Sequence, residues 1–260
     1  MRVFDFTRAI VRTPGASVVG GLRAGAGPDP SLAGVVAEHA GYIAALEAAG
    51  LAVTTLPPLE DFPDAIFVED PALVFPEAAI LLRPGATSRE QEAAFLRPAL
   101  EAAFETVLEL PQGFADGGDV LAMADRVFIG LSARTDRAGA EALAGLLDQI
   151  GRKAVIAETP ASVLHLKTAS SIIDEETILA TADLAASGVF AGYRVLVVPA
   201  GEEAGANVLR ANDVILAGSR FPRILDLLDG HGARLAVLDN AEIEKIDAGF
   251  TCMSLRWFAG

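Results

Sequence analysis

The stretch GDVLAMADRVFIGLSARTDRAGAEALAGLL, residues 118–147, holds a complete structural unit. Two short apolar runs separated by the turn-forming pair Ala124-Asp125 predict two antiparallel strands. A polar stretch follows them, and Thr135 or Asp136 then caps a helix. The pattern is therefore strand, turn, strand, polar loop and helix, and a third strand often follows the helix.

The same plan recurs along the chain. It is found again in three segments, residues 71–95, 167–184 and 206–228. The second strands of the four units begin at Ile80, Val127, Ile178 and Val214, at spacings of 47, 51 and 36 residues. This irregular period lies near the range of about 20–50 residues that is typical of repeat architectures.

A fifth unit is divided between the two ends of the chain. RAIVRTPG at 8–15 resembles AILLRPGA at 79–86, which is a second strand, and CMSLRW at 252–257 would supply the first strand. The helix of this unit is expected at 31–50 and its third strand at 51–56. Terminal strands that share a unit close a ring. The sequence thus predicts a single α/β domain, residues 1–260, of five ββαβ units around a central channel.

Composition limits the classes of function. Apolar residues make up 52% of the 260 residues, so the chain can bury a sizeable core. No apolar run reaches the roughly 20 residues that a membrane helix needs. The net charge of −15 disfavours a nucleic-acid partner and is compatible with a cationic small molecule. A single cysteine excludes an internal disulfide and fits a reducing, cytoplasmic location.

The one cysteine, Cys252, is a candidate nucleophile. A free cysteine usually packs in the core, whereas a nucleophile needs an acid/base partner. Of the three histidines, His39 lies in the amphipathic predicted helix 31–50, where it is expected at the surface or as filler, and His231 lies in a glycine-flanked loop, where a solvated turn is expected. His165, in SVLHLKTAS, lies at the entry to a repeat unit and is the candidate partner.

Carboxylates gather in two motifs. PDAIFVED at 63–70 carries Asp64, Glu69 and Asp70, and FADGGDVL carries Asp116 just before a glycine pair. Adjacent carboxylates are rarely buried without a cationic partner, so each motif taken alone fits a solvated edge or a turn. The glycine pair permits close approach of the backbone.

Radial symmetry changes this interpretation. Asp70, Asp116, His165 and Cys252 each fall near the first strand of a different unit, so a ring would bring them together at one end of its channel. Carboxylates there can hold a planar guanidinium through paired, charge-assisted hydrogen bonds. The cysteine can then attack the guanidinium carbon while the histidine protonates the departing amine. The combination favours guanidine chemistry over ester or peptide hydrolysis.

The sequence resembles the dimethylarginine dimethylaminohydrolase family of the guanidino-modifying pentein superfamily, whose fold is a five-bladed α/β propeller. The resemblance runs along nearly the whole chain and is weakest before Leu22. It rests on seven motifs in order: PDAIFVED, LLRPGATSRE, DGGDVL, FIGLSARTDRAG, LHLKTA, GANVL and EKIDAGFTCMSL. Met253 replaces a second cysteine that many relatives have after the nucleophile.

The resemblance implies a role for each site residue. Cys252 resembles the nucleophile and His165 the general acid/base, while Asp70 and Asp116 resemble the carboxylates that hold the guanidinium. Glu69 resembles the residue that supports this network and orients His165. Asp64 resembles the residue that binds the substrate α-amino group, together with the backbone carbonyls of Leu22 and Ile246. Arg89 and Arg134 resemble the pair that binds the substrate carboxylate. Phe67 resembles the residue that packs near the aliphatic chain.

The implied reaction is hydrolysis of N-omega-methylated arginine to citrulline and methylamine or dimethylamine, without a metal or an organic cofactor. The residues leave two alternatives open. One is an arginine deiminase-type hydrolase that acts on unmethylated arginine or another guanidine. The other is a non-catalytic propeller that only binds a ligand. A homodimer is compatible with the sequence, although no pattern in it specifies an interface.

Overall fold

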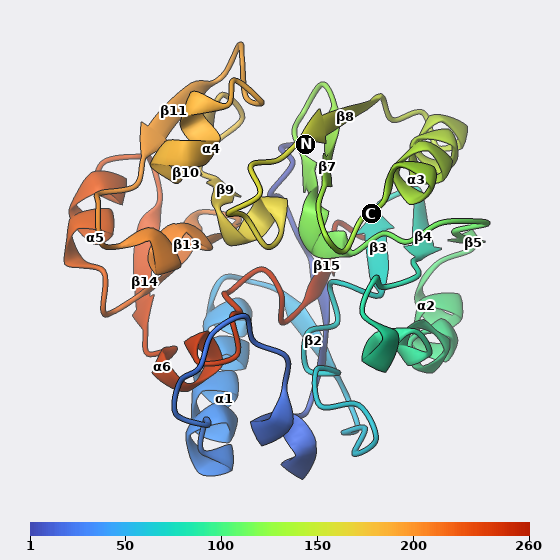
Figure 1. The fold of residues 1–260 in the computed structure, drawn as a ribbon, viewed down its shortest axis with the longest axis horizontal. Helices are drawn as coiled ribbons and strands as arrows, with labels where there is room; N and C mark the ends of the chain where they lie inside the picture. Colours follow the sequence, from blue (N-terminus) through green and yellow to red (C-terminus); the bar gives the residue numbers. More distant parts are fainter.

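Five small sheets surround a common centre in the computed structural model, which describes residues 1–260 (Figure 1). Each sheet has three strands, the first antiparallel to the second and the third parallel to it. The sheets are β3 (Ala72–Phe75), β4 (Ala78–Leu81) and β5 (Val107–Glu109); β6 (Val120–Ala122), β7 (Val127–Leu131) and β8 (Ala154–Glu158); β9 (Ser170–Ile172), β10 (Thr177–Ala180) and β11 (Arg194–Val197); β12 (Leu209–Ala211), β13 (Val214–Gly218) and β14 (Arg234–Leu238); and β15 (Leu255–Trp257), β1 (Arg8–Arg12) and β2 (Ala52–Leu56).

A helix connects the second strand of each sheet to the parallel third strand. The five helices are α1 (Leu32–Ala48), α2 (Arg97–Ala103), α3 (Arg137–Gln149), α4 (Ala182–Ala186) and α5 (Pro222–Leu228). We call a sheet with its helix a blade and name it by its first strand. The predicted caps are present, because the side chains of Ser31 and Asp136 accept hydrogen bonds from the Gly34 and Gly139 amides. A short helix, α6 (Ala241–Glu244), follows the last of the third strands.

The ring closes as predicted, with both chain ends in the β15 blade. β15 pairs antiparallel with β1, so that Arg8 lies opposite Trp257, and β1 pairs in parallel with β2. One chain end thereby fixes the other, and every blade has a neighbour on both sides. The prediction of a five-bladed α/β propeller is confirmed.

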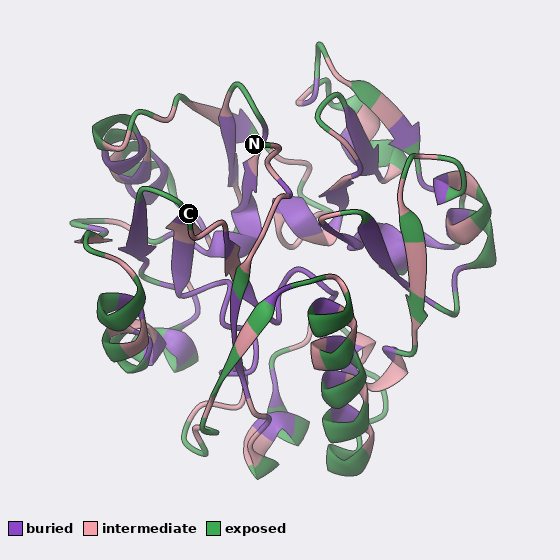
Figure 2. Cartoon of the chain, turned by 180° about the vertical axis from the view of Figure 1, so that it is seen from behind, coloured by how far each residue is buried: buried purple, intermediate pink, exposed green.

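Five hydrophobic cores hold the blades together, one between each adjacent pair. Ile80 and Leu81 show how a single strand serves two of them: Ile80 packs toward the β6 blade and Leu81 toward the β15 blade. Successive side chains of a strand point to opposite faces, and here both faces are covered. The second strands therefore read as unbroken apolar runs instead of alternating patterns. Figure 2 shows the result, with buried residues in the inner strands and exposed ones on the outer strands and helices.

Two local expectations need correction. Cys252 lies in a turn and not in a strand, because β15 begins only at Leu255. His39, expected at the surface or as filler of helix 31–50, is buried with 3% of its surface exposed, and burial lowers its pKa to about 4. The first correction matters for function, since the turn places the thiol ahead of the strand, at the mouth of the central channel.

None of the helices combines the length and the apolar composition that crossing a membrane requires.

Candidate active site

The loops that lead into the first strands meet at one end of the channel and enclose a cavity of about 260 Å³. Short 3-10 turns at Gly117–Asp119 and Leu166–Thr168 form two of these loop ends. Ten of the eleven predicted site residues line the cavity: Leu22, Asp64, Phe67, Asp70, Arg89, Asp116, Arg134, His165, Ile246 and Cys252. The ring thus brings together side chains that are up to 230 positions apart in the chain.

The turn that carries Cys252 is wrapped around a residue of another blade. Asn207 accepts a hydrogen bond from the Thr251 amide through Oδ1 (3.0 Å) and donates one through Nδ2 to the Cys252 sulfur (3.6 Å). Gly249 makes this possible, because a Cβ at that position would lie 2.5 Å from the Asn207 side chain. Asn207 therefore positions the thiol and supplies a donor to it.

The Cys252 thiol is held in its neutral form. Burial, followed by the nearby carboxylates of Glu69 and Asp70, raises its pKa to about 12, because both effects disfavour the thiolate. The hydrogen bond from the Gly249 amide and the charge of Lys167 oppose this shift and do not cancel it. A cation bound beside Asp70 would offset these negative charges and lower the pKa of the thiol.

His165 is held in the opposite state. Burial disfavours the imidazolium, but the Asp70 charge and the Asp116 hydrogen bond outweigh it and raise the pKa of His165 to about 9. The imidazole Nε2 donates to Asp116 Oδ2 at 3.0 Å. Gly118 lies against the ring, since a Cβ there would be 3.0 Å from it. At neutral pH the site therefore contains a protonated imidazole and a neutral thiol.

Two carboxylates face the same space. Asp70 accepts from the Gly118 amide (3.0 Å) and from Arg89, and these contacts and the His165 charge outweigh its burial and lower its pKa. Asp116 accepts from the Gly85 amide at 2.7 Å. Donor atoms of Asp70, Asp116 and His165 lie within 4.8 Å of one another, a spacing that could hold a metal ion or an organic cation.

Glu69 lies behind this set and faces away from it. Its carboxylate accepts from Lys167 (2.6 Å), Arg256 (3.0 Å) and Thr251 (2.9 Å). The expected contact that would orient His165 is absent, because the imidazole bonds to Asp116 instead. Glu69 and Asp70 lie in the turn just before β3, and their carboxylates bond to different partners on the two sides of that turn.

The two arginines expected to hold a carboxylate differ from each other. Arg89 is buried, forms a bidentate pair with Glu92 (2.9 and 2.7 Å), and also donates to Asp70 and to the Phe67 carbonyl (2.9 Å). Its donor directions are therefore used within the protein. Arg134 is half-buried on the cavity wall, and no ion pair of the structure involves its guanidinium.

Asp64 closes the remaining side of the cavity. Its Oδ1 accepts from the Leu22 amide at 2.9 Å, and burial raises the pKa of this carboxyl although Arg89 lies nearby. The loop that begins at Leu22 is joined to the loop after Ile246 by a hydrogen bond from the Ala24 amide to Asp247. These contacts bring Leu22 and Ile246 to the cavity wall beside Asp64.

Sequence reasoning missed three residues that build the site. Asn207 lay in the quoted motif GANVL without a role, and its position at the start of a first strand was the available signal. Glu92 follows Arg89 by three residues, a spacing at which side chains meet on a helical turn. Asp119 accepts from the Leu166 amide (2.9 Å) and so fixes the loop of His165.

Comparisons with known proteins find similar sequences along most of this chain. A family model described as arginine deiminase matches residues 47–196. The N(G),N(G)-dimethylarginine dimethylaminohydrolase of Pseudomonas aeruginosa is 33% identical over 254 residues, which cover 97% of this chain and 100% of the relative. The protein of the same name from Streptomyces coelicolor is 33% identical over 260 residues, with 96% of each chain covered.

The similarity extends to three dimensions. A solved structure of the Pseudomonas aeruginosa enzyme, a cysteine-to-serine variant complexed with citrulline, matches with a TM-score of 0.94 at 32% identity and covers 97% of this chain and 100% of that one. Sequence motifs, ring topology and fold all coincide over the full length. This chain belongs to the dimethylarginine dimethylaminohydrolase family.

Proposed function

We propose that this protein hydrolyses N-omega-methylated arginines, such as asymmetric dimethylarginine and monomethylarginine, to citrulline and dimethylamine or methylamine. The observation that carries the proposal is the meeting of a buried neutral thiol, a protonated imidazole and two carboxylates in one cavity. The citrulline complex of the Pseudomonas aeruginosa relative supports it, because citrulline is the product that this chemistry releases.

Recognition of the substrate follows from the charges. Asp70 and Asp116 would accept hydrogen bonds from the guanidinium nitrogens, which matches their positions around one small space. Asp64 and the loop carbonyls of Leu22 and Ile246 would bind the α-amino group, and Phe67 would pack on the aliphatic chain. Arg134 would bind the α-carboxylate. We assign Arg89 mainly to holding Asp70, since its guanidinium is already saturated.

The first half of the reaction forms a covalent intermediate. When the cationic substrate binds, the Cys252 thiol releases its proton to solvent and the thiolate attacks the guanidinium carbon. The bond to the methylated nitrogen breaks as His165 transfers its proton to that nitrogen, and the neutral amine leaves. A positively charged S-alkylthiouronium remains on Cys252, and His165 is neutral.

The second half hydrolyses that intermediate. Neutral His165 accepts a proton from water, and the oxygen adds to the thiouronium carbon. The carbon–sulfur bond then breaks and the hydroxyl proton passes to the departing sulfur. This step gives the ureido group of citrulline and restores the Cys252 thiol, while His165 is again an imidazolium. Orientation of these groups within one cavity can supply about 7–11 kcal/mol at best.

A citrulline assay tests the proposal. Asymmetric dimethylarginine, monomethylarginine and arginine are compared side by side, with Cys252→Ala as the control for background. We expect citrulline from the two methylated substrates and none from the variant. Citrulline from arginine alone would make the protein a deiminase, and citrulline from none of the three would refute the proposal in favour of another guanidine or of a binding role.

Three broader assignments accompany this function. We propose that residues 1–260 act as one domain, because the five cores form an unbroken ring. We propose a cytoplasmic location, because a thiol nucleophile must stay reduced. A homodimer remains a prediction, which light scattering of the purified protein would test.

A further inference from the structure

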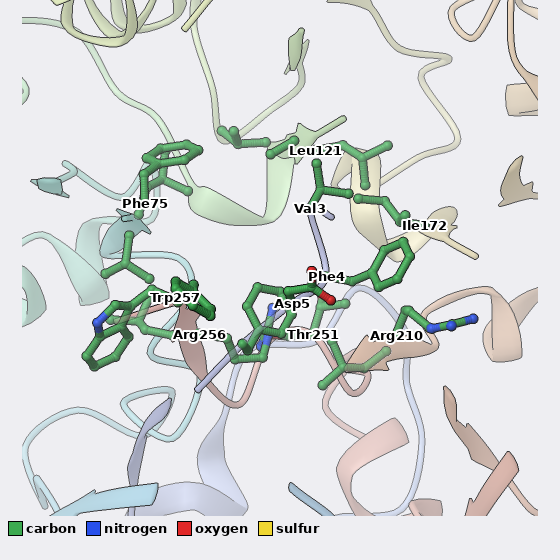
Figure 3. A pocket seen from close by; sticks show the side chains of 18 of the residues that line it. Val3, Phe4, Asp5, Phe75, Leu121, Ile172, Arg210, Thr251, Arg256 and Trp257 are labelled. Atoms are coloured by element: carbon green, nitrogen blue, oxygen red, sulfur yellow. The ribbon is translucent and has the colours of Figure 1, made fainter. Parts of the chain in front are cut away.

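A second cavity of about 320 Å³ opens at the other end of the channel. The first strands run from the catalytic loops to the hairpin turns, and this cavity lies at the hairpin end, bordered by the N-terminal residues 1–6. Figure 3 shows it from close by, with Phe75, Leu121 and Ile172 around its rim and Arg256 and Thr251 toward its centre. It shares no lining residue with the cavity of Cys252.

The wall between the two cavities is made of neighbours of the catalytic residues. Glu69, Lys167 and Thr251 line the second cavity and bond to one another through the Glu69 carboxylate. Glu69 is adjacent to Asp70 in the chain, Thr251 is adjacent to Cys252, and Lys167 follows His165 by two positions. A group bound against this wall would therefore contact residues that are close in the chain to the residues of the reaction site.

The inner end of the second cavity carries an excess positive charge. Lys167 and Arg256 share the single carboxylate of Glu69, which leaves one cation without a counter-charge. Arg256 Nε is buried and has no hydrogen-bond partner. Arg256 also donates through Nη1 to the Thr251 and Ser254 carbonyls, but these neutral acceptors leave the excess charge in place. A buried charge that is not fully neutralised is unfavourable, so an anion at this place would be stabilised. The protein as a whole has a charge of −15, which makes a local excess of cations more notable.

Most of the remaining wall is apolar, although Arg2, Asp5, Arg152 and Arg210 also line the cavity and Asp5 is paired with Arg2. Leu73, Phe75, Leu121, Ile172, Leu209 and Trp257 contribute hydrophobic surface to it. At about 30 Å³ for each water-sized group, the volume holds roughly ten non-hydrogen atoms. Predominantly apolar walls with a few convergent polar groups are typical of small-molecule sites.

We propose that this cavity binds a small amphipathic carboxylate, with its headgroup against Lys167 and Arg256 and its hydrocarbon body among the first strands. Such a ligand would slow turnover from a distance. Lys167 is one of the charges that favour the Cys252 thiolate, and an anion on its far side would counteract it. The binding claim is independent of the proposed function, whereas the effect on turnover rests on it.

Trp257 allows a direct test of binding, because it is the only tryptophan and lines the cavity. Its fluorescence is titrated with octanoate, octylammonium and octanol, which have the same number of carbon atoms and different charge. We expect octanoate to bind at least tenfold more tightly than the other two. Equal affinity of all three, or no saturable change with octanoate, would overturn the proposal.

Two substitutions of opposite charge at one rim position test where the ligand binds. Ile172 is half-buried, lies on the cavity wall and has no part in the reaction. Ile172→Glu should weaken octanoate binding at least tenfold and Ile172→Lys should not, while Val197→Glu, an exposed position on an outer strand, controls for overall charge. Equal effects of the two Ile172 variants, or an equal effect of Val197→Glu, would overturn the assignment.

Kinetics test the coupling between the cavities. Octanoate should lower kcat about fivefold, at the weaker end of usual coupling energies, and leave KM unchanged. A purely competitive pattern would place octanoate in the Cys252 cavity and overturn the proposal. If the protein proves inactive on every methylarginine, the fluorescence titrations still decide whether the second cavity is a binding site.

Discussion

Replacement of Asp116 by Asn removes the carboxylate that holds the proton of His165. The structure gives the imidazole Nε2 one such partner, Asp116 Oδ2 at 3.0 Å. Asn keeps the size of Asp and can still accept the Gly85 amide, so the change is chiefly one of charge. A hydrogen bond to a charged group contributes about 1.5–3 kcal/mol, which corresponds to a pKa change of about 1–2 units. The pKa of His165 should therefore fall from about 9 to roughly 7–8.

The same change should reduce stability in a defined pH range. The folded-state pKa of His165 lies above the value of about 6.5 for a free imidazole, so protonation stabilises the fold by about 3 kcal/mol below pH 6.5. This contribution is lost as the pH rises through about 9. Asp116→Asn should thus lower the free energy of unfolding by about 1–3 kcal/mol near pH 6 and by less near pH 9.

Two measurements check this reasoning. The chain has three histidines, so NMR titration of imidazole signals gives few resonances, and the pKa of about 4 for buried His39 serves as an internal marker. Urea unfolding at several pH values gives the stability. Asp125→Asn, in the exposed hairpin of the same blade, is the control. A His165 pKa that stays near 9 in Asp116→Asn would refute the assignment and leave Asp70 as the group that retains the proton.

Three further outcomes are expected. The rate of alkylation of Cys252 by iodoacetamide should be low at neutral pH and rise about tenfold per pH unit toward the thiol pKa of about 12. A rate that reaches a plateau below pH 8 would contradict the conclusion that burial raises the pKa of this thiol. Asn207→Asp retains the acceptor for the Thr251 amide but removes the donor to sulfur, so kcat should fall about 10–100-fold, and a change below twofold would exclude thiol positioning by Asn207. Arg134→Ala should raise KM in substrate kinetics with little loss of stability. Arg89→Ala should lower the free energy of unfolding in urea by about 3–5 kcal/mol, because it leaves buried carboxylates unpaired. Equal stability of the two variants would contradict the conclusion that the Arg89 guanidinium is fully bonded within the protein.

The repeat pattern was sufficient to predict the fold. Each unit carries its own strand, turn and helix signals, such as the Asp136 cap and the Ala124-Asp125 turn, and these depend on neighbours in the chain. Ring closure also followed from the sequence, because the terminal segments 8–15 and 252–257 lacked partners of their own. The residue at which β15 begins was less predictable, since the apolar turn before it, which holds Cys252, packs in a core and has the composition of a strand.

The candidate site was predicted as a set of residues and only partly as a set of contacts. Placement at the starts of first strands identified Cys252, His165, Asp70 and Asp116, since a ring brings equivalent positions together. It could not show that Glu69 faces the second cavity, because Glu69 lies in a turn, where the direction of a side chain follows no simple sequence period.

What the sequence alone determined is therefore local and periodic: five units, their order, and the residues at equivalent positions in each. What only the tertiary structure decided is which of those side chains touch. Asp116, and not Glu69, bonds to His165. The Arg89 guanidinium bonds to Glu92 and Asp70, and Asn207 donates a hydrogen bond to the sulfur of Cys252. The physical reason is that hydrogen bonds act over about 3 Å between residues of different blades or of different loops of one blade, and tertiary packing sets those distances.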